Sequence, residues 1–296
     1  MTTDLELELD PADLPAVAEF LAAQQADPTR HIGYLNSEPG SIMEQLGGLE
    51  PLGTGGLVVA RIAGRIVGVL AAEWDTDPPR CWWHGPFVAA DADAVEVADA
   101  LLHRAVRLLP SEVTQQEICG DDRHDWLAGF AARHGFVAEE ASAVLDRNLG
   151  ADLPERSVAT VPVEDLVAEQ RDAVAALHDE LFRNTHTPGD RLVSGGTDRL
   201  LVVVEDGAPR GYVAVERQED GAGYLDFLGV APEAQGRGLG SALVAAACHE
   251  MRDGLGCRAT HLTVRVSNTP ARKVYANNGF TQQRVLVPFR KGYSIP

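Results

Sequence analysis

The stretch YLDFLGVAPEAQGRGLGSALVAAACHEM, residues 224–251, passes from a strand pattern through a glycine-rich loop into a helix pattern. Aromatic and branched residues in 224–230 predict a buried strand, and the alanines of 241–251 predict a helix that packs on the sheet. Gly236, Gly238 and Gly240 lie between them and let the backbone approach a ligand. Backbone N–H groups at a helix start, together with the helix dipole, favour an anion. The stretch therefore predicts a phosphate-binding loop.

Two common phosphate loops fit this stretch poorly. A Walker loop needs GxxxxGK[ST], and neither the Lys nor the Ser/Thr stands in its place. A dinucleotide loop needs GxGxxG after the first strand of its unit, whereas this stretch reads GRGLGS and lies late in its unit. On these residues alone, a glycine loop with a purely structural role remains an alternative.

The chain contains two copies of one unit. LVVARIAGRIVGVLAAEW (57–74) is similar to LLVVVEDGAPRGYVAVER (200–217), and both read as β-hairpins. AARHGFV (131–137) likewise matches YANNGFT (275–281). Each copy predicts a mixed α/β fold, a central mixed β-sheet flanked by helices. The polar join GADLPERS (150–157) predicts two domains, at residues 1–150 and 157–296.

Composition predicts ordinary hydrophobic cores, since 45% of the 296 residues are hydrophobic. The start, MTTDLELELD, lacks the basic-then-apolar order of a signal peptide, and apolar stretches such as ALVAAAC are too short to cross a bilayer. We therefore expect a cytoplasmic protein without a membrane partner. Four scattered cysteines and nine histidines have no metal-ligand spacing, so we expect no metal.

The net charge of −19 argues against a nucleic-acid partner, because phosphate backbones need a basic face. The charge is unevenly distributed, since no acidic residue follows Asp253. A basic end on an acidic protein is typical of an anionic-ligand site. The seven basic residues of this end are Arg258, Arg265, Arg272, Lys273, Arg284, Arg290 and Lys291.

The glycine loop resembles the acyl-CoA loop of the GNAT superfamily of N-acetyltransferases, whose pattern is [Q/R]-x-x-G-x-[G/A]. Gln235, Gly238 and Gly240 fill this pattern. NTPARKVYANNGF (268–280) is similar to the family's second signature: an Asn, a Tyr seven residues later, and Gly-Phe. The resemblance covers 157–293 well and 1–150 as a degraded copy, which implies two tandem GNAT-like domains.

This resemblance implies that acetyl-CoA is the cosubstrate and lies between two central strands. Backbone amides of the loop would hold the pyrophosphate, and the preceding strand would pair with the pantetheine arm. Arg272 could face the nucleotide's phosphates or remain a solvated charge of its helix. The cofactor-binding residues implied are Leu228, Gly229, Val230, Gln235, Gly236, Arg237, Gly238, Leu239, Gly240, Asn268, Arg272 and Tyr275.

Acetyl transfer to an amine requires deprotonation of the ammonium and protonation of the departing thiolate. Tyr275 occupies the family's general-acid position, and a phenol suits that task. Asp226 lies two residues before Leu228 and so shares its face of the strand, which makes its carboxylate the first candidate for the base. Glu216, on the neighbouring strand, is the second candidate. A chain of waters is a further alternative to either carboxylate.

The amino-terminal copy has lost these residues. At an offset of 142 residues, Asp93, Ala94, Glu96 and Ala98 replace Gln235, Gly236, Gly238 and Gly240. Aligning the two Gly-Phe pairs puts Ala131 at the position of Tyr275 and His124 at that of Asn268. The amino-terminal domain is therefore predicted to be non-catalytic and unable to bind CoA in the family's manner.

The resemblance places acceptor specificity in 177–196, LHDELFRNTHTPGDRLVSGG, whose mixed charge (His178, Asp179, Glu180, Arg183, His186) indicates a polar small-molecule or peptide amine. The tandem architecture is similar to that of mycothiol synthases, which is one alternative among acetyltransferases. A non-catalytic acyl-CoA-binding or regulatory protein and an interaction scaffold are the alternatives from other classes. The sequence does not decide the oligomeric state, although two fused copies slightly favour a monomer.

Overall fold

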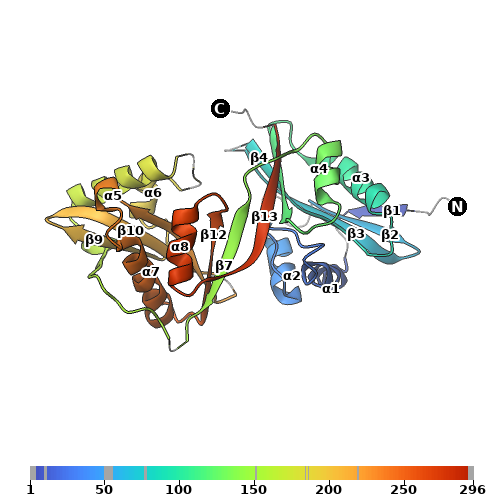
Figure 1. Cartoon of the computed structure of the whole chain (residues 1–296). Helices are drawn as coiled ribbons and strands as arrows, with labels where there is room; N and C mark the ends of the chain where they lie inside the picture. Colours follow the sequence, from blue (N-terminus) through green and yellow to red (C-terminus); the bar gives the residue numbers. More distant parts are fainter. Residues whose placement is uncertain are drawn as a thin grey trace. The chain divides into compact units, whose positions relative to one another are not determined.

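The computed structural model describes residues 5–9, 12–49, 56–76, 79–150, 152–183, 185, 187–218 and 220–292. The chain forms two compact units (Figure 1). Unit 1 comprises Met1–Ala141 with Arg284–Pro296, and unit 2 comprises Ser142–Gln283. These bounds differ from the predicted 1–150 and 157–296, because each unit takes its last strand from the other copy of the repeat.

Unit 1 contains a mixed sheet in the order β1-β2-β3-β4-β5-β13. Only the β4–β5 pair is parallel, and the other neighbours in this order are antiparallel. The strands are β1 (Leu5–Leu9), β2 (Leu57–Ile62), β3 (Arg65–Thr76), β4 (Pro79–Val88), β5 (Gln115–Asp121), β6 (Val137–Ala138) and the latter part of β13 (Thr281–Lys291). The helices are α1 (Leu14–Gln25), α2 (Pro39–Gly48), α3 (Ala94–Ala105) and α4 (Leu127–Arg133).

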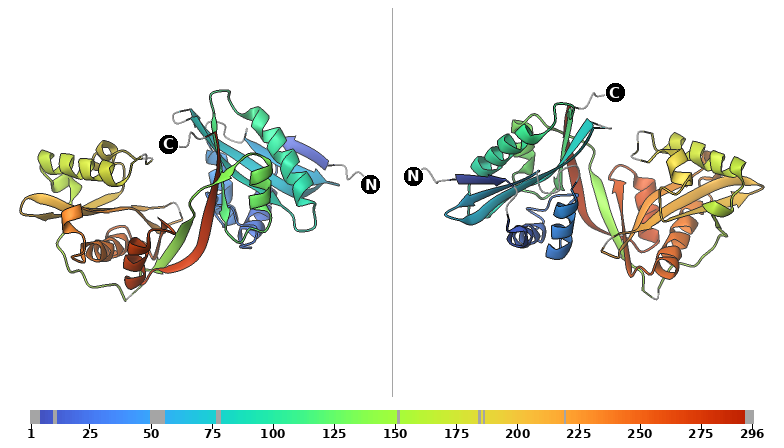
Figure 2. Two further views of the ribbon diagram at one scale, coloured as in Figure 1. Left: turned by 45° about the horizontal axis from the view of Figure 1, so that its top comes forward. Right: turned by 180° about the vertical axis from the view of Figure 1, so that it is seen from behind.

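Unit 2 repeats this arrangement in the order β7-β12-β11-β10-β9-β8, again with one parallel pair, β11–β12. Helices α5 and α6 cover one face of its sheet, and α7 and α8 cover the other (Figure 2). The strands are β7 (Ser142–Asn148), β8 (Val161–Pro162), β9 (Arg199–Glu205), β10 (Ala208–Arg217), β11 (Gly223–Val230) and β12 (Ala259–Arg265). The helices are α5 (Ala168–Leu181), α6 (Gly189–Val193), α7 (Leu239–His249) and α8 (Thr269–Asn277).

The predicted mixed α/β fold and both predicted hairpins, β2–β3 and β9–β10, are confirmed. The exchanged strands were not foreseen. Strand β7 pairs with β12 along its whole length, from Ser142 to Asn148, whereas 286–291 of β13 pair with β5. Because the two strands end equivalent copies, each can satisfy the hydrogen bonds of the other copy's sheet edge.

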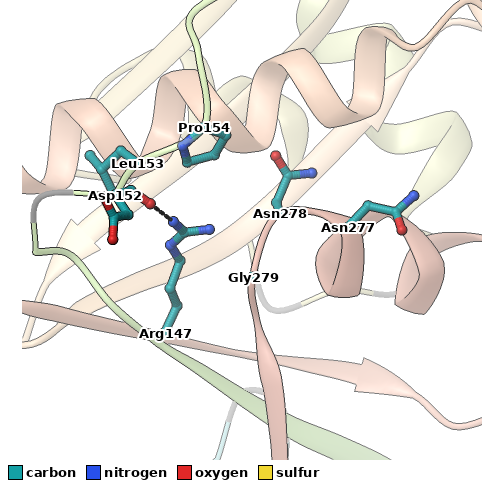
Figure 3. Close-up of a pocket in the computed structure, with 7 residues that line it drawn as sticks. All are labelled: Arg147, Asp152, Leu153, Pro154, Asn277, Asn278 and Gly279. Atoms are coloured by element: carbon teal, nitrogen blue, oxygen red, sulfur yellow. Dashed lines mark hydrogen bonds between the residues drawn. The ribbon is translucent and has the colours of Figure 1, made fainter.

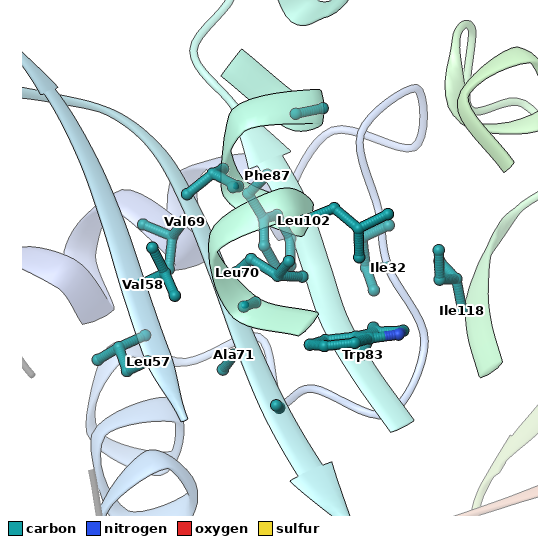
Figure 4. Close-up of a cluster of buried hydrophobic side chains, with 14 of the residues drawn as sticks. Ile32, Leu57, Val58, Val69, Leu70, Ala71, Trp83, Phe87, Leu102 and Ile118 are labelled. Carbon is teal, nitrogen blue, oxygen red and sulfur yellow. The ribbon is translucent and has the colours of Figure 1, made fainter. Parts of the chain in front are cut away.

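Apolar side chains form separate cores in the two units. In unit 1 one cluster includes the fully buried Trp83, Ile118 and Ile32 (Figure 4). In unit 2 one cluster lies between the sheet and α7, and a smaller one, with Tyr212 and Phe227, lies against α5. The sheet of unit 2 is thus buried on both faces, which fixes the position of its central strands.

The predicted join at 150–157 runs along unit 2 and is held by three basic side chains. Arg147 donates to the carbonyl oxygen of Asp152 at 2.5 Å beside a cavity of about 450 Å³ (Figure 3). His249 Nε2 lies 3.0 Å from the carbonyl oxygen of Pro154, and Arg252 donates to that of Gly150 at 3.5 Å. These contacts make the segment part of unit 2 rather than a free linker.

Within the described ranges, no helix is long and apolar enough to cross a membrane. The same residues include no group of three or more His, Cys, Asp or Glu side chains that could hold a metal ion.

Candidate active site

The two central strands of unit 2 diverge. Strands β11 and β12 pair only at Gly223–Thr260 and Tyr224–His261. Beyond these pairs lies a cavity of about 600 Å³ between the strands, the end of α5 and the start of α8. Its lining residues are Glu180, Leu181, Phe182, Arg183, Thr185, Asp226, Leu228, Thr263, Val264, Arg265, Asn268, Ala271 and Tyr275.

A β-bulge positions Asp226 at this cavity. Ala214 pairs with Phe227 and Val215 pairs with Leu225, so Asp226 is the extra residue of β11. Bulges bend a strand and redirect its side chains. Asp226 and Leu228 both line the cavity, as their shared face predicted. Glu216 pairs with Tyr224 and is not among the lining residues of this cavity, so the geometry favours Asp226 between the two candidate bases.

Helix α7 begins on glycines whose backbone only glycine adopts easily. Gly236 and Gly238 have φ angles of 75° and 82°, in the left-handed region. A Cβ at either position would meet open space, so the surface of the loop is accessible. Gly238 is the N-cap residue and has no side chain with which to cap the first-turn amides. These amides, at the positive end of the helix dipole, are suited to an anion.

The remaining predicted loop and strand residues have varied surroundings. Gln235 donates to the carbonyl oxygen of Val230 at 3.2 Å, and Arg237 forms an ion pair with Glu205 at 3.1 Å. Leu239 is buried in the core of unit 2. Gly229 is explained by packing, because a Cβ there would overlap the ring of Tyr212. A Cβ at Gly240 would make ordinary contacts with Leu228, Val230 and Val274, so no steric reason requires glycine there.

Tyr275 lies on the cavity wall and is only 7% exposed. Its ring makes an edge contact with Phe280 at 5.8 Å between centroids. Burial, with a smaller effect of Tyr224, raises the pKa of Tyr275 to about 12. The phenol therefore keeps its proton at neutral pH, which is the form that a general acid needs.

Asn268 and Arg272 have structural contacts of their own. Asn268 is the N-cap of α8 and accepts from the amide of Ala271 at 3.2 Å, although it also lines the cavity. Arg272 donates to the carbonyl oxygen of Val266 at 3.2 Å and to Gln282 at 3.0 Å. These bonds hold α8 to its neighbours, and a contact of Arg272 with the nucleotide's phosphates stays a prediction.

The basic residues at the end of the chain are divided between the two units. Arg284, Arg290 and Lys291 belong to unit 1, where Arg290 donates to the buried Glu117 at 2.7 Å. Of the seven basic residues of this end, Arg265 lines the cavity of unit 2. The expectation that this end of the chain binds an anionic ligand stays a prediction.

Sequence reasoning missed the contributions of Thr263 and Arg265 on β12. The alternating pattern of β12 could have revealed them, because exposed residues alternate there with the buried Leu262 and Val264. In the predicted acceptor segment, Glu180 and Arg183 line the cavity, whereas His178 is fully buried behind it. His186 lies outside the described residues.

Comparison with known proteins agrees with this geometry. Residues 164–280, all within unit 2, match the model of the Acetyltransferase (GNAT) family. Unit 2 carries a GNAT acetyltransferase domain.

Relatives and solved structures extend the similarity beyond this GNAT domain. A mycothiol acetyltransferase from Actinosynnema mirum is 28% identical over 88% of this chain and 78% of its own length. Seven further relatives of that name match over 30% to 66% of their own lengths. A GCN5-related N-acetyltransferase structure from Sphaerobacter thermophilus has a TM-score of 0.73, with 19% identity over 97% of this chain and 95% of its own.

A tandem GNAT protein from the clavulanic acid biosynthesis pathway has a TM-score of 0.62, with 18% identity over 99% of this chain and 100% of its own. At these identities, the two structures show the fold alone. They confirm that two GNAT-like units in tandem are the architecture of the whole chain.

The start of helix α3 in unit 1 differs from that of α7 in the GNAT domain. Asp93 caps α3, and its Oδ1 accepts from the amides of Val95 and Glu96, both at 3.0 Å. A carboxylate of the chain thus takes the amides that an anion would need. The ungapped offset that placed Glu96 on Gly238 is wrong, because 89–93 connect β4 to α3 whereas the longer 231–238 connect β11 to α7. The cap of α3 therefore corresponds to Gly238.

The cleft between β4 and β5 in unit 1 is filled by its own chain. These strands pair at four positions, from Arg80 to Trp83 on β4. Beyond them, Ile32 pairs with Gly120 of β5, and Gly33 donates to the carbonyl oxygen of Cys119 at 2.7 Å. Arg30 donates to the carbonyl oxygen of Val88, the residue that matches Val230, at 2.8 Å. We call residues 30–34 the plug segment.

Proposed function

We propose that this chain transfers an acetyl group from acetyl-CoA to a primary amine of a small polar acceptor, and that the site is the cavity of unit 2. The glycine N-cap of α7, at the end of the loop that follows the strand bordering the cavity, is the observation that carries the proposal. Anion-binding amides and an open strand edge suit the two halves of a CoA molecule, its pyrophosphate and its amide-rich arm.

The roles follow from position. The amides of 238–240 would hold the pyrophosphate, and the backbone of Leu228 and Val230 would pair with the pantetheine arm. Asp226 would accept the proton of the acceptor ammonium, either directly or through water. The free amine then attacks the thioester carbonyl, and the C–S bond breaks as Tyr275 donates its proton to the departing thiolate. The attacking nitrogen loses its second proton, which returns through water to the Tyr275 phenolate. The products are an N-acetylated acceptor and free CoA.

The cavity walls indicate the acceptor class. Glu180 and Asp226 supply carboxylates, Arg183 and Arg265 supply guanidinium groups, and Thr185 adds a hydroxyl. Such walls suit an acceptor with a cationic amine and several polar groups. The relatives are named mycothiol acetyltransferases, so the desacetyl, free-amine form of mycothiol is our first candidate.

Unit 1 is proposed to bind no acetyl-CoA, because the Asp93 cap and the plug segment occupy the corresponding positions. A cytoplasmic location and a monomeric state stay predictions from the sequence.

Calorimetric titration with acetyl-CoA, followed by mass spectrometry of desacetylmycothiol incubated with acetyl-CoA, tests both proposals. We expect one equivalent bound and a product heavier by one acetyl group. Two equivalents would contradict the proposal for unit 1, and absence of binding would contradict that for unit 2. Binding without transfer to desacetylmycothiol or to a panel of other amines would favour a non-catalytic acyl-CoA-binding protein.

A further inference from the structure

His178 of α5 is fully buried with both ring nitrogens in hydrogen bonds. Its Nδ1 lies 2.7 Å from the hydroxyl of Tyr212, and its Nε2 lies 2.9 Å from the carbonyl oxygen of Thr187. The backbone carbonyl can only accept, so Nε2 carries the hydrogen. In the neutral ring, Nδ1 then accepts from the hydroxyl of Tyr212. Tyr212 thereby selects the tautomer that binds Thr187.

These bonds belong to a set of contacts that anchors described residues at both ends of the connection between α5 and α6. The ring of His178 stacks on Phe182 at 5.2 Å between centroids, and the amide of Gly189 donates to Asp179 at 2.7 Å. Successive residues of α5, His178 and Asp179, therefore hold the far end of the segment, while Phe182 holds its start.

Described residues next to these anchors line the cavity. Phe182, Arg183 and Thr185 are among its lining residues, together with Asp226. Phe182 also contacts Phe227, the residue after Asp226, at 5.1 Å between centroids. Because Gly229 on the same strand has no side chain, the ring of Tyr212 can pack against its backbone. The His178–Tyr212 pair thus connects the strand that bears Asp226 to the segment that bears Arg183 and Thr185.

We infer that His178, oriented by Tyr212, is a positioning residue for the acceptor side of the cavity. It sets the place of Arg183 and Thr185 relative to Asp226, and so controls acceptor affinity without contacting acetyl-CoA. The inference rests on the proposed function, because it assumes that the acceptor enters this cavity.

The test compares Tyr212→Phe, which removes one hydroxyl, with His178→Leu and His178→Gln. Because a hydrogen bond to a neutral partner contributes about 1 kcal/mol, or roughly fivefold, we expect Tyr212→Phe to raise the KM for desacetylmycothiol about fivefold. The kcat and the Kd for acetyl-CoA should stay unchanged. His178→Leu should raise that KM further, and His178→Gln, which keeps an N–H for Thr187, should partly restore it.

His249→Gln is the matched control. His249 also lies near a backbone carbonyl oxygen, that of Pro154, but this contact holds the join at 150–157 rather than the acceptor side of the cavity. It should leave the KM unchanged. An equal KM change in this control, or an equal loss of acetyl-CoA affinity in Tyr212→Phe, would overturn the inference.

Hydrogen exchange separates this inference from the proposed function. The amides of Thr185, Thr187 and Gly189 should exchange faster in Tyr212→Phe and not in His249→Gln, whether or not the wild type acetylates the chosen amine. Unchanged exchange at these three amides would overturn the positioning role. If the wild type transfers no acetyl group, the proposed function fails, and the exchange comparison still decides whether His178 fixes the segment.

Discussion

The two units have the same fold, yet the helix after the central strand begins differently in each. The N-cap residue of helix α7 is Gly238, which has a φ of 82° and no capping side chain. The N-cap residue of α3 is Asp93, whose carboxylate accepts from two first-turn amides. A helix N-terminus favours negative charge in either form. In unit 1 a carboxylate of the chain supplies that charge, whereas in unit 2 the N-cap glycine has no side chain that could supply it.

The clefts between the parallel strands also differ, because the chain itself fills the one in unit 1 and a cavity remains in unit 2. In unit 1 the backbone of the plug segment bonds to β5, and Ile32 joins the core. In unit 2 the corresponding strands pair at two positions and border a cavity. Pro86 matches Leu228 at the offset of 142 residues and has no N–H to offer a pantetheine arm. Buried backbone groups need partners, and in unit 1 the plug segment supplies them to β5.

Cutting the chain at different points gives the largest expected effect. A fragment of residues 142–283 should fold and bind acetyl-CoA, because it contains every strand of unit 2. A fragment of residues 157–296 should not fold, since it lacks β7 and the buried Ala143, Leu145 and Leu149. Removing buried side chains of this kind lowers the free energy of unfolding by several kcal/mol, which approaches the whole stability of a domain. Circular dichroism and calorimetry check both, and a folded 157–296 fragment would show that the exchanged strand is dispensable.

Tyr275→Phe should give the next largest effect. Removing a general acid costs roughly 10²- to 10⁴-fold in rate, so we expect kcat to fall by that factor while the Kd for acetyl-CoA stays the same. Since the pKa of Tyr275 is raised to about 12, its protonated form persists as the pH rises, and it should cause no loss of wild-type activity below about pH 11. The position of Tyr275 corresponds to Ala131 in unit 1, which is fully buried.

An unchanged kcat in Tyr275→Phe would remove the proposed chemical difference between the units. The pH profile is a second check, because an alkaline loss that is absent from the Phe variant and centred well below pH 11 would contradict the raised pKa.

Much of this comparison was predictable from the sequence, because it depends on local patterns. The glycine loop, the alternation of β11 and the matching turns before Phe136 and Phe280 each follow from neighbouring residues. The exchanged strands were not predictable, since β7 and the end of β13 carry similar patterns and either could pair with either edge. The cap of Asp93 was misplaced because a shorter loop changes the alignment without changing either helix pattern. The plug segment depends on long-range pairing that no local pattern encodes.

Gly238→Asp should give the start of α7 a negative charge, as Asp93 gives the start of α3. The new carboxylate would lie near the first-turn amides and repel the pyrophosphate, so we expect acetyl-CoA affinity to fall about 100-fold, as a loss of about 2.7 kcal/mol. Gly238→Asn is the control, because Asn has nearly the same size, also tolerates a positive φ and carries no charge. It should weaken binding about tenfold or less. Equal losses in the two variants, measured by calorimetry, would mean that charge does not distinguish the two helix starts.

Acid should weaken unit 1 through two buried histidines. Burial, with repulsion from Arg284, lowers the pKa of His31 to about 4, and burial with repulsion from Arg30 lowers the pKa of His124 to about 4. The unfolded chain binds these protons near pH 6.5 and the folded chain does not, so stability falls as the pH drops from 6.5 towards 4. At pH 5 each histidine should cost about 2 kcal/mol.

Tryptophan fluorescence isolates this effect, because all four tryptophans (Trp74, Trp82, Trp83 and Trp126) belong to unit 1. The urea midpoint seen by fluorescence should drop between pH 7 and pH 5, and the double variant His31→Asn with His124→Asn should flatten that dependence. Burial also lowers the pKa of His261 in unit 2, so unit 2 has a pH-dependent group of its own. Acetyl-CoA binding, followed over the same pH range, reports separately whether unit 2 stays folded. If the double variant keeps the full pH dependence of the fluorescence midpoint, the buried histidines are not what makes unit 1 acid-sensitive.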